Sequence, residues 1–583
     1  MITARTRTRP RAPAAALAGV AAAAALVLGT GVTAADYTDR THAVAELTTE
    51  TWAAVQPELV WTSSTAAFLA EGKVYLGGFR GNGASGTGVA TVGATQPPTQ
   101  VDLPVPVVKV VGATDNFDHG AAASTTWFAA LGTDGVVYQW GSNYGSSISG
   151  TGNRPRAVTT YSPSGGTTGT HPLPPVVDLT SSENQIYALD ADGTMYVWGH
   201  AGENLPNPVG GGTARTVPLP ANITVDVATG MSSVGVVQDG RILPGTGNGA
   251  RSVAWHRVYG GQNSSFGVTR EGLVYVWGFD AHAGVATESS TVNQRAPRDA
   301  RGVNALLFET YPEIYHAADG RTLQAGDPAY WTTYAAIYQD MKGREVCTGA
   351  YDVTRAYDDS GCPVRQLSTG ARTFRVLLAN HQMSTWAAST ASYGWPSLGR
   401  YVASTSTSAG GYVPAPIQTS QDGPTLSVHH FSAGTGAVQV VTTDGQVYGW
   451  GANNWCQAIG IHSTGGYADP DRNGGNCHQQ GSTATTGLRP AGAVWYATRV
   501  WAVPDDVRVT DLGGTACTTW MTDEEGTMYA FGGSTVVGSD YRNCVVNAGH
   551  GYRIYDFNDA TLATPFGSAV DRQGVATRVV FGS

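Results

Sequence analysis

Charged residues are scarce in this chain of 583 residues: Asp, Glu, Lys and Arg make up 13% of it, against about 25% in an average globular protein. Only three of the 34 basic residues are lysines, a bias associated with bacteria that have GC-rich genomes. No long apolar stretch follows the first 35 residues, which excludes a bundle of membrane-spanning helices. With 76 glycines the chain falls far below the composition that a collagen triplet repeat requires.

Recognised catalytic motifs are also missing. The sequence contains neither H-E-x-x-H nor G-x-S-x-G, and its single Gly-Lys pair, Gly72-Lys73, lies in a repeated turn and not in a phosphate-binding loop. His429 and His430 are adjacent, and since successive strand residues face opposite ways we do not expect them to chelate a metal. The net charge of -10 makes nucleic acid a poor partner. We therefore expect a protein that is not an enzyme and does not bind nucleic acid.

Residues 1–35 have the pattern of an export signal. Four arginines, ending at Arg11, precede an apolar run at 14–28, and small residues follow up to Ala35. The alternative is an uncleaved membrane anchor, since the run nearly reaches spanning length. Cleavage would leave a lead segment at 36–58 and a main domain at 59–583 with no membrane span, secreted or held at the cell surface.

The six cysteines form an even set, which in an exported chain indicates disulfides. Six cysteines allow 15 connectivities, and the short separations favour sequential pairing. The expected pairs are Cys347 with Cys362, Cys456 with Cys477, and Cys517 with Cys544.

An internal repeat is the strongest feature of the sequence. An acid-Gly turn is followed by a strand in which Tyr and Trp or Phe stand two residues apart before a closing Gly, as in Asp134 to Gly141. The acid-Gly pair suits a tight hairpin turn, and residues two apart share one face of a strand, so the aromatic face must be buried. The clear copies have turns at Glu71-Gly72, Asp134-Gly135, Asp192-Gly193, Glu271-Gly272, Asp444-Gly445 and Glu525-Gly526. Such hairpins predict small antiparallel sheets that stack on one another.

The repeat D-G-x-V-Y-x-W-G, with an upstream V-x-x-V-x-x-G strand, resembles that of the regulator of chromosome condensation family, and it covers the chain from about Val60 to Gly582. Asp444 to Gly460 is the best match to the family pattern. The resemblance implies an all-β, closed β-propeller with seven blades. It also suggests a secreted bacterial member, similar in architecture to β-lactamase-inhibitory propellers.

The number of copies differs from seven. Weaker copies at Asp239 and Asp319 bring the count to eight, and a doubtful one from Trp386 to Trp395 makes nine. The first copy lacks an upstream strand of the repeat type, whereas the chain ends in an orphan strand at 575–582. We therefore expect the C-terminal strand to complete the first blade and so close the ring.

Long insertions follow most of the Trp-Gly strands, at 146–175, 200–218, 282–301, 327–366, 455–494 and 533–562. Insertions at the same point of each repeat emerge on one face, where loops commonly bind partners. Aromatic residues enriched at binding hot spots lie in or beside these insertions, the alternative being that they pack the loops onto the scaffold. The expected binding residues are Tyr144, Tyr161, Tyr330, Trp331, Trp455, Tyr467, Trp495 and Tyr541.

One segment resembles part of a calcium loop. Asp469, Asp471 and Asn473 place oxygen ligands at alternate positions before Gly474, but the twelfth position is Gln480 and not Glu. The alternative is a simple Asp/Asn/Gly turn. Calcium is the one ion the sequence offers, and otherwise no cofactor is expected.

Three functions fit these features. The first is a secreted, monomeric propeller that binds another protein through a loop-rich face. The second is a structural component of the cell surface or of a matrix fibre. The third is a glycan-binding or hydrolytic propeller with aromatic platforms for sugar rings.

Overall fold

The computed structural model divides the chain into the units Met1–Thr51 and Trp52–Ser583, and every described residue belongs to the second. The described segments are 56–58, 65–78, 86–88, 99–114, 126–141, 154–161, 171–182, 185–199, 211–216, 223–225, 232–234, 254–261, 264–278, 294–315, 320–341, 343–370, 373–387, 398–400, 402, 411–433, 437–452, 458–459, 493–500, 503, 507–514, 518–524, 528–533 and 572–579. None of the helices in these segments is long and apolar enough to cross a membrane.

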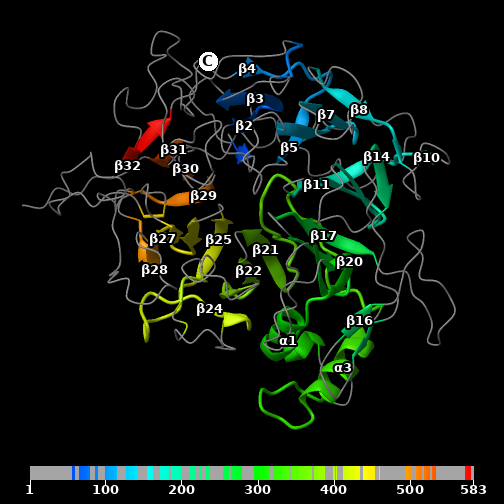
Figure 1. Cartoon of the computed structure of the whole chain (residues 1–583), viewed down its shortest axis with the longest axis vertical. Helices are drawn as coiled ribbons and strands as arrows, with labels where there is room; N and C mark the ends of the chain where they lie inside the picture. The colour runs from blue at the N-terminus through cyan, green and yellow to red at the C-terminus, as the bar shows by residue number, and fades with distance from the viewer. Residues whose placement is uncertain are drawn as a thin grey trace, which may run out of the picture. The chain divides into compact units, whose positions relative to one another are not determined.

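Antiparallel strands dominate the described chain and form seven sheets of four or more strands (Figure 1). Sheet 1 contains β1 (Gln56–Glu58), β2 (Thr65–Ala70), β3 (Lys73–Gly78) and β4 (Thr99–Gln100); sheet 2 contains β5 (Val107–Thr114), β6 (Thr126–Gly132), β7 (Val137–Gly141) and β8 (Arg156–Val158). Sheet 3 contains β11 (Val176–Ser181), β12 (Gln185–Asp190), β13 (Met195–Gly199) and β14 (Gly211–Thr216), extended by β9 (Thr160–Tyr161) and β10 (His171–Pro172). Sheet 4 contains β17 (Trp255–Tyr259), β18 (Ser264–Thr269), β19 (Val274–Gly278) and β20 (Gln294–Asp299).

The last three sheets are built in the same way. Sheet 5 contains β21 (Val364–Gly370), β22 (Thr373–Leu378), β23 (Met383–Ala387) and β24 (Ala415–Pro416); sheet 6 contains β25 (Val428–Ala433), β26 (Ala437–Thr442), β27 (Val447–Ala452) and β28 (Ala493–Arg499). Sheet 7 contains β29 (Val509–Gly514), β30 (Thr518–Asp523), β31 (Met528–Gly533) and β32 (Arg572–Val579). A separate pair, β15 (Ile223–Val225) and β16 (Ser232–Val234), lies between sheets 3 and 4 in the sequence.

Three helices interrupt the strands between sheets 4 and 5: α1 (Arg301–Thr310), α2 (Pro312–Tyr315) and α3 (Tyr330–Met341). Their apolar residues, including Val303, Leu307 and Tyr334, join the buried core of sheet 4. Tyr315 reaches the tip of the β18–β19 hairpin, where its hydroxyl donates to the carbonyl oxygen of Gly272 at 2.8 Å. The all-β prediction therefore describes the sheets but missed this helical insertion.

The repeated hairpin forms as its sequence predicts. Gly135 has a φ of 75°, and Asp134 Oδ1 accepts from the backbone N–H of Val136 at 3.0 Å, so the acid closes the turn that Gly permits. Tyr138 donates its hydroxyl to Asp134 Oδ2 at 2.9 Å, which ties the following strand to the same turn. Trp140 on that strand is fully buried.

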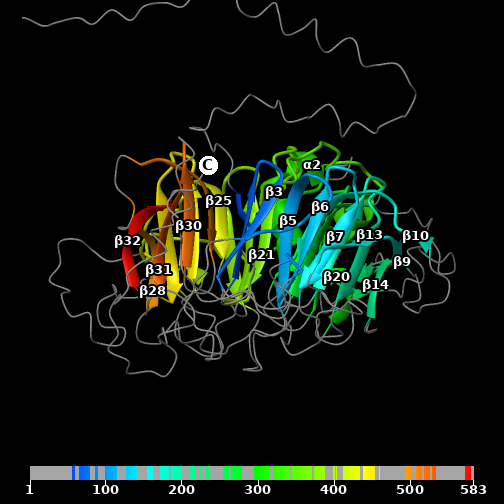
Figure 2. The ribbon, with the colours of Figure 1, turned by 90° about the horizontal axis from the view of Figure 1, so that it is seen from above.

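Consecutive sheets pack through the tryptophan of one against the strands of the sheet before it. Trp198 Nε1 donates to Gln139 Oε1 at 2.8 Å between sheets 3 and 2, and Trp277 Nε1 donates to the Tyr187 hydroxyl at 3.1 Å between sheets 4 and 3. The first strand of each sheet contacts the first strand of the next, and β29 of the last sheet contacts β1 of the first. Figure 2 shows the sheets from a second direction, in which the strands of neighbouring sheets run side by side.

The predicted strand exchange at the chain ends is wrong. β32 pairs with β31 and is the fourth strand of sheet 7, while β1 pairs with β2 in sheet 1. β1 escaped notice because it is three residues long and lacks the repeat's V-x-x-V-x-x-G pattern. The orphan strand therefore serves its own sheet.

The structure also revises the repeat count. Ile314 belongs to α2 and residues 320–324 form no strand, so the copy at Asp319 is not a sheet hairpin. The doubtful copy from Trp386 to Trp395 lies mostly outside the described residues, whereas a hairpin that ends at its start, β22–β23, was missed; the turn of that hairpin has Asn380 and His381 in place of the acid and Gly. His381 takes the left-handed φ of 68°, and Asn380 Oδ1 accepts from Gln382 N at 3.0 Å as the acid does elsewhere. The copy at Asp239 lies outside the described residues.

Candidate functional site

In six of the seven sheets, the first strand in chain order carries a polar residue at its third position. In β5, β11, β17, β21, β25 and β29 the pairing register shifts next to the first residue, and the third residue is polar. Five of these side chains are buried and the sixth is partly buried. We call this set the polar belt: Lys109, Asp178, Arg257, Gln366, His430 and Asp511.

The belt residues pair from one sheet to the next. Asp178 lies 3.1 Å from Lys109 Nζ on the sheet before it and 4.0 Å from Arg257 Nε on the sheet after it. His430 Nε2 lies 2.7 Å from Asp511 Oδ1. Because a buried charge that loses its partner is costly, the contacts of Asp178 depend on the alignment of sheets 2, 3 and 4.

Gln366 makes the corresponding link to the backbone of sheet 6. Its Nε2 donates to the carbonyl oxygen of Phe431 at 2.7 Å, and its Oε1 accepts from the N–H of Phe431 at 3.1 Å. An amide side chain thus occupies both hydrogen-bonding groups of one residue of β25.

A single segment from the helical insertion lies against this belt. We call residues 343–363, between α3 and β21, the plug; in Figure 1 this green segment extends from the start of β21 toward β11. Tyr351 donates its hydroxyl to Asp178 Oδ2 at 2.8 Å, and the Arg257 guanidinium lies 4.2 Å from the centre of its ring. Arg257 also donates to the carbonyl oxygen of Arg355. The plug therefore completes the link between the first strands of sheets 3 and 4.

The C-terminal half of the plug reaches sheets 5 and 6. The Tyr357 ring lies 4.7 Å from the Arg365 guanidinium and 5.0 Å from the His429 ring, and its hydroxyl accepts from Arg355 at 2.7 Å. Toward sheets 2 and 3, Val353 packs against the core that contains Val108 of β5 and Leu179 of β11. One short segment thus touches the first strands of sheets 3, 4, 5 and 6.

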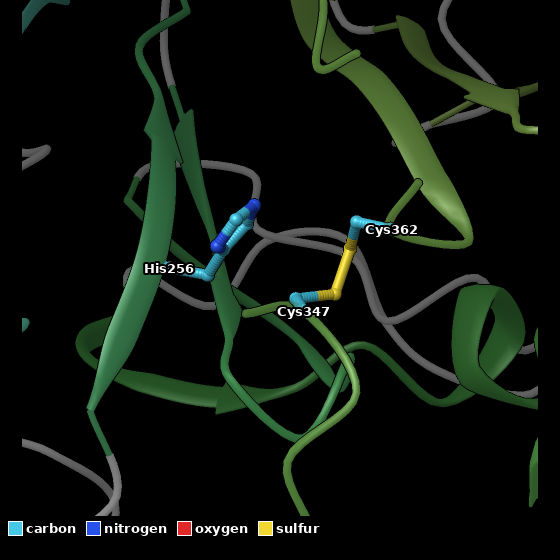
Figure 3. Close-up of side chains that lie close together, drawn as sticks. All are labelled: His256, Cys347 and Cys362. Atoms are coloured by element: carbon cyan, nitrogen blue, oxygen red, sulfur yellow. A yellow bond between two sulfur atoms is a disulfide. The ribbon is translucent and has the colours of Figure 1, made fainter. Parts of the chain in front are cut away.

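Both ends of the plug are anchored. The backbone N–H groups of Val346 and Cys347 donate to the carbonyl oxygen of Arg270 at 2.7 and 2.8 Å, beside the β18–β19 turn. The disulfide between Cys347 and Cys362 joins the two ends and confirms the first predicted pair (Figure 3). Cys456, Cys477, Cys517 and Cys544 lie outside the described residues, and so do the two pairs predicted for them.

Neighbouring charged and polar groups keep Asp358 and Arg257 ionised although both are buried. Burial acts to raise the pKa of Asp358, but its hydrogen bond with His256 and the charge of Arg257 hold that pKa below its usual value. Burial acts against the charge of Arg257, yet Tyr259 and Asp178 raise its pKa overall. Both side chains are therefore ionised at neutral pH.

In contrast to Asp358 and Arg257, His429 of sheet 6 is held in its neutral form. Burial, followed by the nearby Arg365 guanidinium, lowers the pKa of His429 to about 4. This imidazole is therefore neutral at physiological pH and presents an uncharged ring to Tyr357.

The residues around His256 do not form a catalytic triad. Asp358 Oδ2 and Ser360 Oγ lie 2.5 and 3.3 Å from the same ring nitrogen, Nε2, whereas a triad needs the acid and the nucleophile on opposite nitrogens. The imidazole is also buried, so a substrate could not reach it.

The same imidazole lies near two sulfur atoms, as a metal ligand would. One ligand atom from each of His256, Cys347 and Cys362 lies within 4.8 Å of the others (Figure 3). The sulfurs are joined to each other, however, and a disulfide lacks the thiolates that bind zinc. The predicted calcium ligands Asp469, Asp471 and Asn473 lie outside the described residues.

Four of the predicted binding aromatics fall in the described chain. Tyr161 on β9 and Trp495 on β28 are partly buried, and the Tyr161 ring packs edge-on against Tyr196 at 5.0 Å. Tyr330 and Trp331 begin α3, with the Trp331 ring 5.6 Å from the Arg301 guanidinium. Tyr144, Trp455, Tyr467 and Tyr541 lie outside the described residues.

The insertion at 327–366 does not share the position of the others. It follows the fourth strand, β20, and so starts from the end of the sheets that carries the acid-Gly turns. The other five insertions extend over the connection between the third and fourth strands, at the opposite end. Tyr330 and Trp331 therefore belong to the turn end and not to the expected common face.

The belt and the plug were missed from sequence. A signal was present, because aligning the first strands as V-V-K, V-V-D, W-H-R, V-R-Q, V-H-H and V-T-D shows a polar third residue in each. The plug has no such pattern, and only the cysteines at its ends marked it.

This chain aligns with solved structures that include the family whose repeat it resembles. No family model matches its sequence. Prp20p of Saccharomyces cerevisiae, studied for its binding to Gsp1p and histones, aligns with 12% identity and a TM-score of 0.47 over 91% of this chain and 87% of that one. Yeast RCC1 (Prp20), bound to Kap60, aligns with 13% identity and a TM-score of 0.45 over 99% and 91%. Human WBSCR16 aligns with 14% identity and a TM-score of 0.41 over 79% and 84%.

Two of these three structures are of yeast RCC1 (Prp20). At these low identities and TM-scores the likeness says nothing about what this chain binds. Its strand pairing and its repeat carry the description of the fold.

Proposed function

We propose that this protein is a secreted, closed, seven-bladed propeller that binds another protein through the loops at one end of its sheets. The seven sheets and the contact between β29 and β1 support closure, with the sheets as blades. In this arrangement the ring closes by packing between the first and last blades and needs no strand exchange. The export signal supports secretion or display at the cell surface.

The observation that carries the binding proposal is the plug. Tyr351 of the plug already donates to Asp178 of the belt, Asp358 of the plug pairs with His256, and the His256 cluster has no catalytic arrangement. Recognition is then left to the insertions between third and fourth strands, at the end opposite the plug's anchor at Arg270. Large loops on a rigid scaffold are a common means of binding a macromolecule.

Two tryptophans at opposite ends of the sheets test this proposal. The experiment immobilises the mature chain and captures partners from the medium and envelope of the producing organism. Trp455→Ala, in an insertion between third and fourth strands, should reduce capture of a stoichiometric partner at least tenfold with an unchanged melting temperature. Trp331→Ala, at the turn end, is the matched control and should capture normally.

Equal loss in both variants would contradict the assignment of the binding end. A stoichiometric glycan in place of a protein would favour the third reading. Sedimentation of the chain with intact cells, without a soluble partner, would favour the surface or matrix reading.

A further inference from the structure

Arg375 is a fully buried cation in the middle of β22. Its side chain has no exposed surface, and the one hydrogen bond that it makes within the described part of the chain runs from Nη2 to Thr373 Oγ1 at 2.9 Å. Nε and Nη1 are buried and have no hydrogen-bond partner. A buried guanidinium in this condition is expensive, because it has left water without gaining a counter-charge.

A second buried arginine, Arg400, lies close by. Arg400 is buried and donates to the carbonyl oxygen of Thr385 at 3.1 Å, and Thr385 is the cross-strand partner of Arg375. Burial alone lowers the pKa of Arg375 to about 9 and that of Arg400 to about 10, so both are charged at neutral pH. Arg257 differs, because Asp178 lies beside it.

Arg375 occupies a place at which two other sheets carry a hydrogen-bond acceptor. Gln139 and Tyr187 belong to the equivalent cross-strand pairs of sheets 2 and 3, where each accepts the indole N–H of the next sheet's tryptophan. In sheet 5 the equivalent pair is Arg375 and Thr385. A guanidinium has five donors and no acceptor, so it cannot replace the acceptor of Gln139.

The surroundings restrict what could bind there. Leu377, two residues from Arg375 and on the same face of β22, shares a buried core with Trp450 of β27, so Arg375 lies between sheets 5 and 6. Tightly packed space between two sheets excludes a large organic anion. We propose that a small monovalent inorganic anion, such as chloride, binds Arg375 there and accepts hydrogen bonds from Nε and Nη1.

Two measurements test the site. In crystals of the wild-type chain soaked in bromide, anomalous scattering should show a peak within hydrogen-bonding distance of the Arg375 guanidinium. In solution at constant ionic strength, replacing gluconate with chloride should raise Tm by about 1 °C for each tenfold increase above the dissociation constant.

Arg375→Gln should abolish the chloride effect, since it supplies a neutral acceptor like that of Gln139. Arg154→Gln, at a largely exposed arginine, is the matched control and should keep the wild-type chloride dependence. A water molecule and no bromide beside Arg375 would overturn the proposal. So would a chloride dependence that persists unchanged in Arg375→Gln.

Discussion

Removing the charge of Asp178 should weaken the packing of three sheets at once. Its carboxylate accepts from Lys109 and Tyr351 and lies beside Arg257, and the Lys109 and Arg257 side chains are 8% and 2% exposed. Asp178→Asn leaves two buried cations without their anion, for which the expected loss is about 3–5 kcal/mol. With an unfolding entropy of about 2.1 cal/mol/K per residue over roughly 530 residues, Tm should fall by about 3–5 °C.

Differential scanning calorimetry measures this change directly. Asp102→Asn is the control, because Asp102 forms an ion pair with Arg154 in which both side chains are about two-thirds exposed, and its loss should cost less than about 1 kcal/mol. Adding Lys109→Met to Asp178→Asn should recover part of the loss, since one stranded cation is removed. A Tm for Asp178→Asn equal to that of the control would refute the role of the belt.

Three further results are expected. Replacing Cys347 and Cys362 with Ser opens a 15-residue loop and should cost about 3 kcal/mol, and limited proteolysis should then cut within the plug, whereas an uncut plug would show that the disulfide is dispensable. The pKa of Asp358 is lowered, so its contribution to stability is complete above the unfolded-state pKa of about 4 and is lost as pH falls through the lower folded-state pKa. Asp358→Asn should therefore reduce the loss of unfolding free energy at acid pH, measured by urea titration at several pH values. Asp359→Asn, at an exposed aspartate, should leave that loss unchanged. His381→Val should destabilise by about 1–2 kcal/mol in the same assay because β-branched residues resist its φ of 68°, and His381→Gly should change little; equal effects would contradict a strained turn.

The sequence predicted what depends on local chemistry. The repeated turn is stabilised by residues that are close in the sequence, so its pattern can be read directly. Asp134 accepts from the N–H of Val136 to close the turn at Gly135, and its second oxygen accepts from the Tyr138 hydroxyl. Burial of Trp140 follows from its place on the same face as Tyr138. The β22–β23 hairpin was missed because Asn380 and His381 take the places of the acid and Gly in its turn.

Contacts between distant segments were beyond such reasoning. Lys109 and Asp178 are 69 residues apart, and Tyr351 meets Asp178 across 173 residues, so neither pairing leaves a local pattern. The C-terminal strand was assigned to sheet 1 because the three-residue β1 was overlooked, and a strand's sequence does not name its neighbour. Aromatic residues in insertions were equally ambiguous, as Tyr161 shows by packing against Tyr196.

The central claim is that residues 343–363 pack against the first strands of the sheets through the buried side chains of Cys347, Tyr357 and Asp358 and the contacts of Tyr351. Hydrogen exchange measured by mass spectrometry tests it most directly, because the amides of Val346 and Cys347 donate to the carbonyl oxygen of Arg270 in the β18–β19 turn, and the amide of Asp358 donates to that of Arg365 in β21. Peptides covering these amides should exchange as slowly as those of β17. Exchange within seconds, as in an exposed loop, would contradict the claim.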